Sequence, residues 1–304
     1  GNGAITTAAA ATAANNTPTP HPAQKGSSVL LTGRRPFFYL YDLEAARIER
    51  VLAPKNVPAP LKSLERFAAM GPGACRMTNE PLVAFYGDQG YVPLVSLRSR
   101  QAVASVKLPG AAVGAAAFAE DGIELWTSGK DDGLVSVWDI RMSRHCRFQF
   151  RDQGNAGGGG AASLAVSPDS RFIATGSRSG IVNVYRRQEL DAAVAAAAYS
   201  GPISHNLAPA KELTNLVTAV DAMKFSEDSQ MLVFSSRLTR DALRVAHLPS
   251  MTVFANWPTS KTPMGHVQCA DVTSEGGMIV MGNAKGRAAL YRLNHYSAAK
   301  RGRR

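Results

Sequence analysis

Cysteine is scarce in this sequence, and no long apolar run occurs. The 304 residues include three cysteines, Cys75, Cys146 and Cys269, which stand far apart and form no CxxC pair. This pattern excludes a disulfide scaffold and a zinc ribbon and fits a reducing compartment. No run approaches the roughly 18 apolar residues of a membrane-spanning helix, so no transmembrane segment is expected.

The sequence also lacks the short motifs of common enzyme sites. It contains no GxxxxGK[ST], GxGxxG, GxSxG or HExxH. Its six histidines show no metal-ligand spacing. Asp131 and Asp132 form a carboxylate pair, but a tight turn before Gly133 explains them without acid–base chemistry. We therefore expect no catalytic activity, no metal and no cofactor.

Basic residues are in excess, with 34 Lys and Arg against 23 Asp and Glu and a net charge of +11. Such an excess favours a polyanionic partner, most often nucleic acid. The tail at 298–304 ends in KRGRR, which supplies the candidate contacts Lys300, Arg301, Arg303 and Arg304. It is an RNA-binding element, a nuclear or nucleolar address, or only a solvated end.

Residues 1–26 are rich in Ala, Thr, Asn and Pro and show no periodic apolar face. We predict that this segment is disordered, because it cannot repay the entropy of ordering. The chain begins with Gly1 rather than methionine, which indicates a fragment, and its start lacks the features of a signal peptide.

From Ser27 onward, short β-rich runs alternate with turn residues, and one phrase recurs six times. Its copies read PFFYLYDL (36–43), GYVPLVSL (90–97), GLVSVWDI (133–140), GIVNVYRR (180–187), DALRVAHL (241–248) and GRAALYRL (286–293). Two further strands precede most copies, and a fourth, such as CRFQF (146–150) or TVFANW (252–257), often follows. Four short strands in about 45 residues is the period of a WD-repeat β-propeller blade.

The fold class predicted for 27–297 is therefore all-β, a WD-repeat β-propeller. About six blades of an expected seven are recognisable, and the first is incomplete because no strand is evident before Ser27. Two insertions interrupt the period: an alanine-rich segment (188–210) with one helical stretch, and a glycine-rich connection (154–160). Loops on this fold tolerate such additions at little cost.

Three residues are predicted to be structural from their phase in the repeat. Trp138 and Asp139 form the dipeptide that gives the repeat its name, and we expect Trp138 to pack between blades rather than to stack on bases. His266, in the pair Gly265-His266, stands at the spacing the repeat expects before Tyr291. We expect it to serve the hydrogen-bond network of its blade.

The loops between second and third strands share one rim of such a fold, and here they are basic. The candidate RNA or partner contacts on this rim are Arg34, Arg35, Lys130, Arg178, Arg237, Arg240 and Lys285, against Asp88, Asp131, Asp132 and Asp241. The opposite rim is nearly balanced, with seven basic and six acidic side chains. Ordinary solvated turn charge is the alternative interpretation.

The segment 257–263, WPTSKTP, is a further candidate, because it bridges two blades on the basic rim. Alternation along TVFANW places Val253, Ala255 and Trp257 on one face of a strand. Trp257 then either packs between blades or faces a partner. Lys261, at the loop centre, has no evident core role and is a candidate contact.

Four segments go beyond the generic repeat. KSLERF (62–67), SLAVSPDSRFIATGSRSGIVNVY (163–185), HLPSMTVFANWPTSKTP (247–263) and GRAALYRLNHYS (286–297) resemble the family of U-three small nucleolar RNA-associated protein eighteen. The resemblance runs from about residue 35 to residue 297 and implies a non-catalytic WD-repeat subunit of the small subunit processome in the nucleolus. The implied partners are other processome subunits, the small nucleolar RNA particle and pre-ribosomal RNA. The charged N-terminal extension of that family, with its exosome-recruiting motif, is not found in these residues.

Two other functions remain open from the residues alone. A generic WD-repeat adaptor of the ubiquitin-ligase or chromatin type would bind a peptide on the same rim, and co-purification with ribosomal RNA separates it from the first reading. A propeller hydrolase would need acids converging on a central channel, and the first strands of the repeats carry few inward acids.

Overall fold

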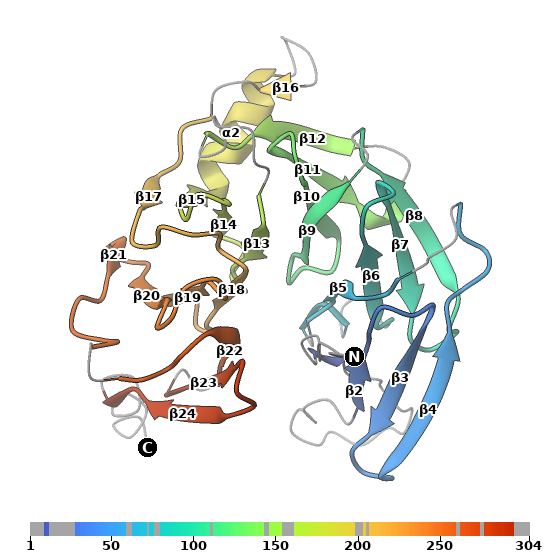
Figure 1. Cartoon of the computed structure of the whole chain (residues 1–304). Coiled ribbons are helices and arrows are strands. Elements are labelled where there is room, and N and C mark those ends of the chain that lie inside the picture. Colours follow the sequence, from blue (N-terminus) through green and yellow to red (C-terminus); the bar gives the residue numbers. More distant parts are fainter. Residues whose placement is uncertain are drawn as a thin grey trace, which may run out of the picture. The chain divides into compact units, whose positions relative to one another are not determined.

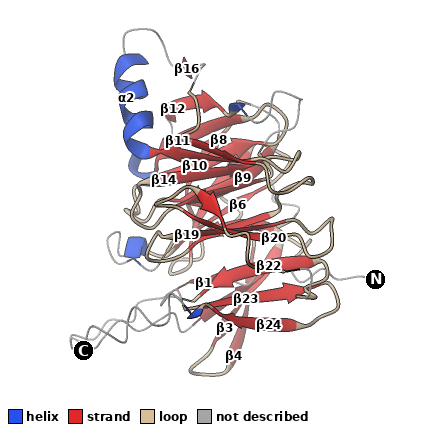
Figure 2. Ribbon diagram, turned by 90° about the vertical axis from the view of Figure 1, so that its left-hand side faces the viewer, coloured by secondary structure: helices blue, strands red, loops and turns tan. Residues whose placement is uncertain are grey.

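The computed structural model describes residues 9–11, 28–58, 63–71, 73–75, 80–109, 112–142, 146–153, 161–197, 203–204, 207–259, 262–273 and 277–294. Most of the segment 1–26, the glycine-rich connection at 154–160, Lys261 and the tail 298–304 lie outside these residues. Strands predominate in the described part (Figures 1 and 2). None of its helices combines the length and the apolar character required to cross a membrane.

The strands form six mostly antiparallel sheets, named A to F here in chain order, and the chain divides into two compact units. Unit 1 comprises 1–129 and 136–148, and unit 2 comprises 130–135 and 149–304. Six sheets that each repeat the same strand phrase are the architecture of the WD-repeat β-propeller class, so the predicted fold class is confirmed.

Unit 1 contains sheets A and B and most of sheet C. Sheet A has the order β1 (Ala9–Ala11), β2 (Ser28–Leu31), β3 (Phe37–Asp42), β4 (Arg47–Leu52). Sheet B has the order β5 (Arg66–Ala69), β6 (Leu82–Tyr86), β7 (Tyr91–Ser96), β8 (Ala102–Lys107). Sheet C has the order β16 (Ile203–Ser204), β12 (Cys146–Arg151), β11 (Leu134–Asp139), β10 (Glu124–Gly129), β9 (Val113–Phe118), and the short 3-10 helix η1 (Ile140–Met142) follows β11.

Unit 2 contains sheets D, E and F. Sheet D has the order β13 (Ser163–Val166), β14 (Phe172–Gly176), β15 (Val182–Arg186), β17 (Lys211–Leu213), and helix α2 (Arg187–Ala197) lies between its last two strands in the chain. Sheet E has the order β18 (Ala222–Phe225), β19 (Met231–Ser235), β20 (Leu243–His247), β21 (Thr252–Val253). Sheet F has three strands, β22 (Val267–Val272), β23 (Met278–Asn283) and β24 (Ala288–Arg292).

All six copies of the recurring phrase are third strands, namely β3, β7, β11, β15, β20 and β24. The helical stretch expected in the alanine-rich insertion is α2, where Arg187 and Asp191 pair across one turn at 3.0 Å. The predicted strands were found because apolar alternation and turn residues are local properties of the sequence.

The structure differs from the sequence prediction before Ser27. Ala9–Ala11 pairs antiparallel with Ser28–Leu31, with Ala9 opposite Leu30 and Ala11 opposite Ser28. The disorder expected over 1–26 therefore does not extend to these three residues, and sheet A has four strands. An alanine run gives no alternating pattern, yet its backbone N–H and C=O groups are sufficient to form a ladder.

A second difference lies in TVFANW, which was expected to be a strand throughout. Strand β21 covers only Thr252–Val253, and after the bond from Phe254 N to Val245 O (2.9 Å) the backbone bends away. The predicted alternation of Val253, Ala255 and Trp257 is therefore wrong. Because Trp257 lies outside the strand, its side-chain direction is set by its packing contacts and not by the alternation of a β-strand.

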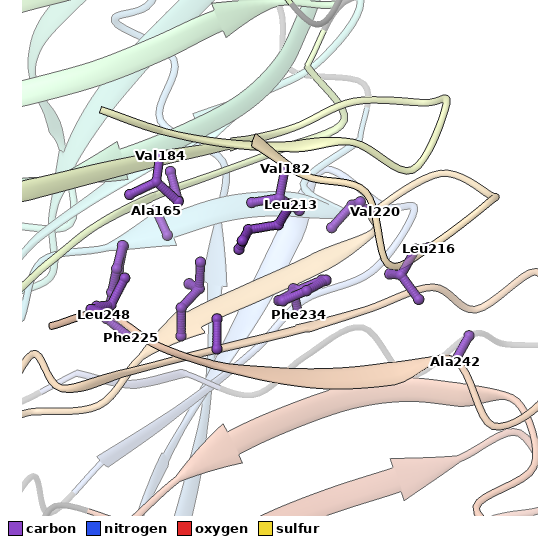
Figure 3. Packing of buried hydrophobic residues seen from close by; sticks show 13 residues of the cluster. Ala165, Val182, Val184, Leu213, Leu216, Val220, Phe225, Phe234, Ala242 and Leu248 are labelled. Atoms are coloured by element: carbon purple, nitrogen blue, oxygen red, sulfur yellow. The ribbon is translucent and has the colours of Figure 1, made fainter. Parts of the chain in front are cut away.

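The core of unit 2 lies between neighbouring sheets. Between sheets D and E, alternate residues of β15 (Val182 and Val184) meet Leu232 and Phe234 of β19 in one buried cluster (Figure 3). Because side chains alternate between faces in a strand, a valine at every second position supplies a continuous apolar face. A second cluster between sheets E and F is built in the same way.

Two hairpins of unit 2 repeat one polar turn. In SPDS (167–170) the Ser167 hydroxyl donates to Asp169 (2.6 Å) and accepts from Phe172 N (2.9 Å), and Ser226 does the same with Asp228 (2.5 Å) and Met231 N (3.0 Å) in SEDS. The backbone N–H of Asp169 also donates to the Ser229 hydroxyl at 3.2 Å, which ties the two hairpins together.

We expect the Asp169 turn to give unit 2 part of its acid sensitivity. Burial raises the pKa of Asp169, but hydrogen bonds from Ser167 and Arg171 outweigh it and hold the pKa below its ordinary value. Its stabilisation is therefore complete above the unfolded-state pKa of about 3.9 and is lost as pH falls through the lower folded-state value. Urea unfolding at several pH values should show a shallower acid limb in Asp169→Asn than in the wild type. Arg171→Met, which keeps the carboxylate, should move the limb to higher pH; three coincident curves would contradict the assignment.

Candidate nucleic-acid and partner interface

The basic candidates of unit 2 lie in equivalent loops between second and third strands. Lys130 follows β10, Arg178 lies between β14 and β15, Arg237 and Arg240 lie between β19 and β20, and Lys285 lies between β23 and β24. Backbone hydrogen bonds connect the loops of sheets D and E to the segments that enter the next sheet, from Val220 N to Ser177 O and from Asp241 N to Gly265 O. Within sheet F, Ala284 N donates to His266 O. Backbone hydrogen bonds therefore support the basic loops of sheets D, E and F.

Two of these arginines are held by carboxylates. Arg237 pairs with Asp221, which accepts from its Nε at 3.3 Å and from its backbone N–H at 3.0 Å. Arg178 lies 3.8 Å from Asp131 in an exposed pair, which contributes little to stability. In both pairs the guanidinium stays about half exposed, so it can still meet a partner.

Arg240 and Lys285 differ from these two. Both are exposed, and no carboxylate within the described residues pairs with either side chain. An unpaired surface cation loses little when it exchanges water for a phosphate or a carboxylate. These two residues are therefore the best placed of the basic candidates in unit 2 to bind an anion.

The carboxylate of Asp241, the residue after Arg240, accepts hydrogen bonds from the backbone. Its Oδ1 accepts from Met264 N at 2.7 Å and Gly265 N at 2.8 Å, and its own φ of 56° lies in the left-handed region. Asp132 behaves as predicted for a tight turn, since it accepts from Leu134 N at 3.0 Å and Gly133 has φ of 64°. Backbone hydrogen bonds thus account for Asp132 and Asp241, two of the acids that the charge count set against the basic rim.

His266 bonds outside its own sheet. Its Nδ1 lies 3.1 Å from the carbonyl oxygen of Arg237, in the loop of sheet E, and the residue is half-buried. The sequence placed it in the network of its own blade; the structure shows instead that it steadies the loop that carries Arg237 and Arg240.

In unit 1, Arg34 and Arg35 lie in the loop between β2 and β3. Arg34 Nε lies 2.9 Å from Glu65, whereas Arg35 is exposed with no carboxylate partner among the described residues.

Trp138 is 4% exposed, packs among the side chains of sheets B and C, and donates from Nε1 to the Thr127 hydroxyl at 2.8 Å. Asp139 binds Arg141 at 2.8 Å, and this hydrogen bond lowers the pKa of the Asp139 carboxyl.

The bridging segment turns Trp257 inward. Its ring lies 5.3 Å from that of Tyr291 in an edge-on contact, at the border of the cluster between sheets E and F. The Thr259 and Thr262 hydroxyls are 3.1 Å apart, and the candidate contact Lys261 lies outside the described residues. Of the two roles considered for Trp257, the structure therefore shows packing.

Sequence reasoning missed two buried carboxylates. Asp152 accepts from Asn183 Nδ2 at 2.6 Å and from the Tyr185 hydroxyl at 2.5 Å. Burial, and then the Asp152 carboxylate, raise the pKa of the Tyr185 hydroxyl well above its usual range. Glu124 accepts from Trp126 Nε1 at 3.2 Å and pairs with Arg147. Acidic residues are usually exposed, so the sequence gives no reason to predict that Asp152 or Glu124 is buried. The one indication is the position of Tyr185 in the repeat, where a buried hydroxyl needs a hydrogen-bond partner.

These carboxylates do not form a metal centre. No group of three or more His, Cys, Asp or Glu side chains suited to a metal ion occurs in the described ranges. The polar partners of Asp152 and Glu124 include an amide, a hydroxyl, an indole and a guanidinium, which are donors typical of structural networks.

Known proteins are similar in sequence to this chain over most of its length. Residues 151–186 match the family described as WD domain, G-beta repeat. The U3 small nucleolar RNA-associated protein 18 homolog of Arabidopsis thaliana is 35% identical over 274 residues, which cover 90% of this chain and 45% of that protein. The chain is similar to proteins named U3 small nucleolar RNA-associated protein 18. The mouse homolog is 32% identical with the same coverage, and the Saccharomyces cerevisiae protein is 36% identical over 176 residues, covering 54% of this chain and 28% of its own.

The resemblance noted from four sequence segments therefore extends along nearly all of the chain. The chain spans about half the length of the curated relatives it matches.

Proposed function

We propose that this chain is a non-catalytic WD-repeat scaffold of the small subunit processome. In this role it supports pre-ribosomal RNA processing and small ribosomal subunit biogenesis in the nucleolus. The observation that carries the proposal is the 35% identity over 274 residues to a protein named as U3 small nucleolar RNA-associated. Its partners would be other processome subunits, the small nucleolar RNA particle and pre-ribosomal RNA.

The chemistry of the described surface supports a binding role. The net charge is +11, and exposed cations without carboxylate partners in the described residues, Arg35, Arg240 and Lys285, lie in loops supported by backbone hydrogen bonds. The buried carboxylates of Asp152 and Glu124 are engaged by amide, hydroxyl, indole and guanidinium donors, which supports a structural role for them. A preformed basic surface on a rigid sheet scaffold loses little conformational entropy on binding.

The test is recovery of RNA with the full chain expressed in eukaryotic cells. Epitope-tagged wild-type chain should co-purify with U3 small nucleolar RNA and pre-ribosomal RNA. Arg240→Glu should reduce that recovery by about fivefold, because it replaces one anion contact by a repulsive charge. Arg292→Glu, an exposed position in the same unit at the end of β24 away from the β23–β24 loop, is the matched control and should leave recovery unchanged. If the wild type brings down ubiquitin-ligase or chromatin subunits without either RNA, the adaptor reading replaces this one.

A further inference from the structure

Two large apolar side chains stand out from the loop surface of sheets D and E. Val217 is 83% exposed, the highest value among the large apolar residues of the described ranges, and Leu238 is 63% exposed. The other exposed apolar residues lie in strands β3, β4, β8, β23 and β24, in the turn at Leu43 and in η1. Val217 and Leu238 lie in loops, so their exposure does not come from the uncovered face of a sheet.

The two side chains belong to neighbouring loops that hydroxyls hold together. Thr218, next to Val217, lies 2.8 Å from the Ser236 hydroxyl and 3.1 Å from that of Thr239, through its Oγ1. Leu238 stands between Ser236 and Thr239 in the second loop. These two contacts join the residue next to Val217 to the loop segment that contains Leu238.

The platform beneath them is rigid. The loop between β14 and β15 packs directly against the segment that contains Leu216 and Val217, because a Cβ at Gly180 would lie 2.4 Å from the Leu216 carbonyl oxygen. Gly180 also has φ of 95°, so no other residue type fits the turn without strain. Val220 N donates to Ser177 O at 3.0 Å on the same side. An exposed apolar pair on a fixed backbone is preorganised for a partner.

Positive charge surrounds the pair. Arg237 is adjacent to Leu238 in sequence and stays half exposed while it holds Asp221, whose side chain is largely covered. Arg240, two residues beyond Leu238, is exposed, and no carboxylate of the described chain pairs with it. Arg178, in the loop that rests on Leu216, is also half exposed. The surface thus combines two apolar anchors with three guanidinium groups.

We propose that this surface, defined by Arg178, Val217, Arg237, Leu238 and Arg240, binds a short acidic segment of a partner protein that carries two apolar side chains. Apolar anchors in a polar rim are the anatomy of protein interfaces. Carboxylates beside them would meet arginines in the fork geometry that guanidinium favours. RNA is the weaker match, because a phosphate backbone offers nothing to cover Val217 and Leu238. This inference rests on the proposed function, since the partner would be a subunit of the same particle.

The experiment is site-specific photo-crosslinking in cells, with p-benzoylphenylalanine in place of Leu238 in the full tagged chain. We expect one protein adduct, whose crosslinked peptide is rich in Asp and Glu and contains apolar residues. The probe in place of Met142, which is 65% exposed on η1, should not form this adduct. In the chain with the probe at 238, Val217→Ser together with Arg240→Glu should reduce the adduct at least tenfold.

The outcomes separate the two proposals. Adducts only to RNA at 238, no adduct, or a protein peptide without an acidic stretch each overturn the acidic-segment surface. Recovery of U3 small nucleolar RNA with the tagged wild-type chain, which carries neither probe nor substitution, is read in parallel and reports on the proposed function alone. If the acidic adduct forms while that RNA is absent, the surface stands and the assignment to the processome falls.

Discussion

Replacing Trp138 by alanine is expected to remove roughly 3–5 kcal/mol from the free energy of unfolding, the cost of deleting a buried aromatic side chain. The indole packs among Leu94, Val106 and Leu125, between sheets B and C of unit 1. Its Nε1 also donates to the Thr127 hydroxyl, which lies 3.3 Å from the Ser136 carbonyl oxygen and donates to it. Alanine would leave a cavity and remove one buried hydrogen bond.

Equilibrium urea unfolding followed by fluorescence and by circular dichroism measures this loss. Trp138→Phe separates the two contributions, because it retains most of the ring but not the N–H donor, and it should cost about 1–2 kcal/mol. A loss below about 1 kcal/mol for Trp138→Ala would show that the indole is not a packing residue of this interface.

Replacing Asp152 by alanine should be similarly severe, at roughly 3–5 kcal/mol, because it leaves two buried donors without an acceptor. Those donors are the Tyr185 hydroxyl and the Asn183 amide, and the Tyr185 ring also packs 5.1 Å from that of Phe150. Asp152 is 2% exposed, and its backbone N–H donates to Gly133 O at 3.0 Å.

A double-mutant cycle tests the origin of this loss. Asp152→Asn keeps the shape and one acceptor and should cost less than alanine. Tyr185→Phe should be costly in the wild type but nearly neutral once Asp152 is alanine, since the hydrogen bond is then already absent. Additive losses would show that Tyr185 and Asp152 act independently, contrary to the 2.5 Å contact between them.

The candidate surface was only partly visible in the sequence. Counting the charged residues in the predicted turns identified Arg240 and Lys285 as candidate contacts. A turn between two strands is exposed, so this prediction holds wherever the two strands were predicted correctly. The same count treated Asp241 as an opposing charge, although two backbone N–H groups of residues 264 and 265 occupy it. It also passed over Val217 and Leu238, since apolar residues next to strands are read as core.

What the sequence by itself determined is the repeating framework: the six third strands, the helix in the alanine-rich insertion and the loops that carry the basic residues. These follow from alternation, turn residues and repeat spacing, which act within a few residues along the chain. Tertiary structure alone decided that Ala9–Ala11 pairs with β2, that Trp257 turns onto Tyr291 and that Asp152 is buried beneath Tyr185. The physical reason is that these contacts join residues 17 or more positions apart, where backbone ladders, ring packing and burial depend on which sheets become neighbours.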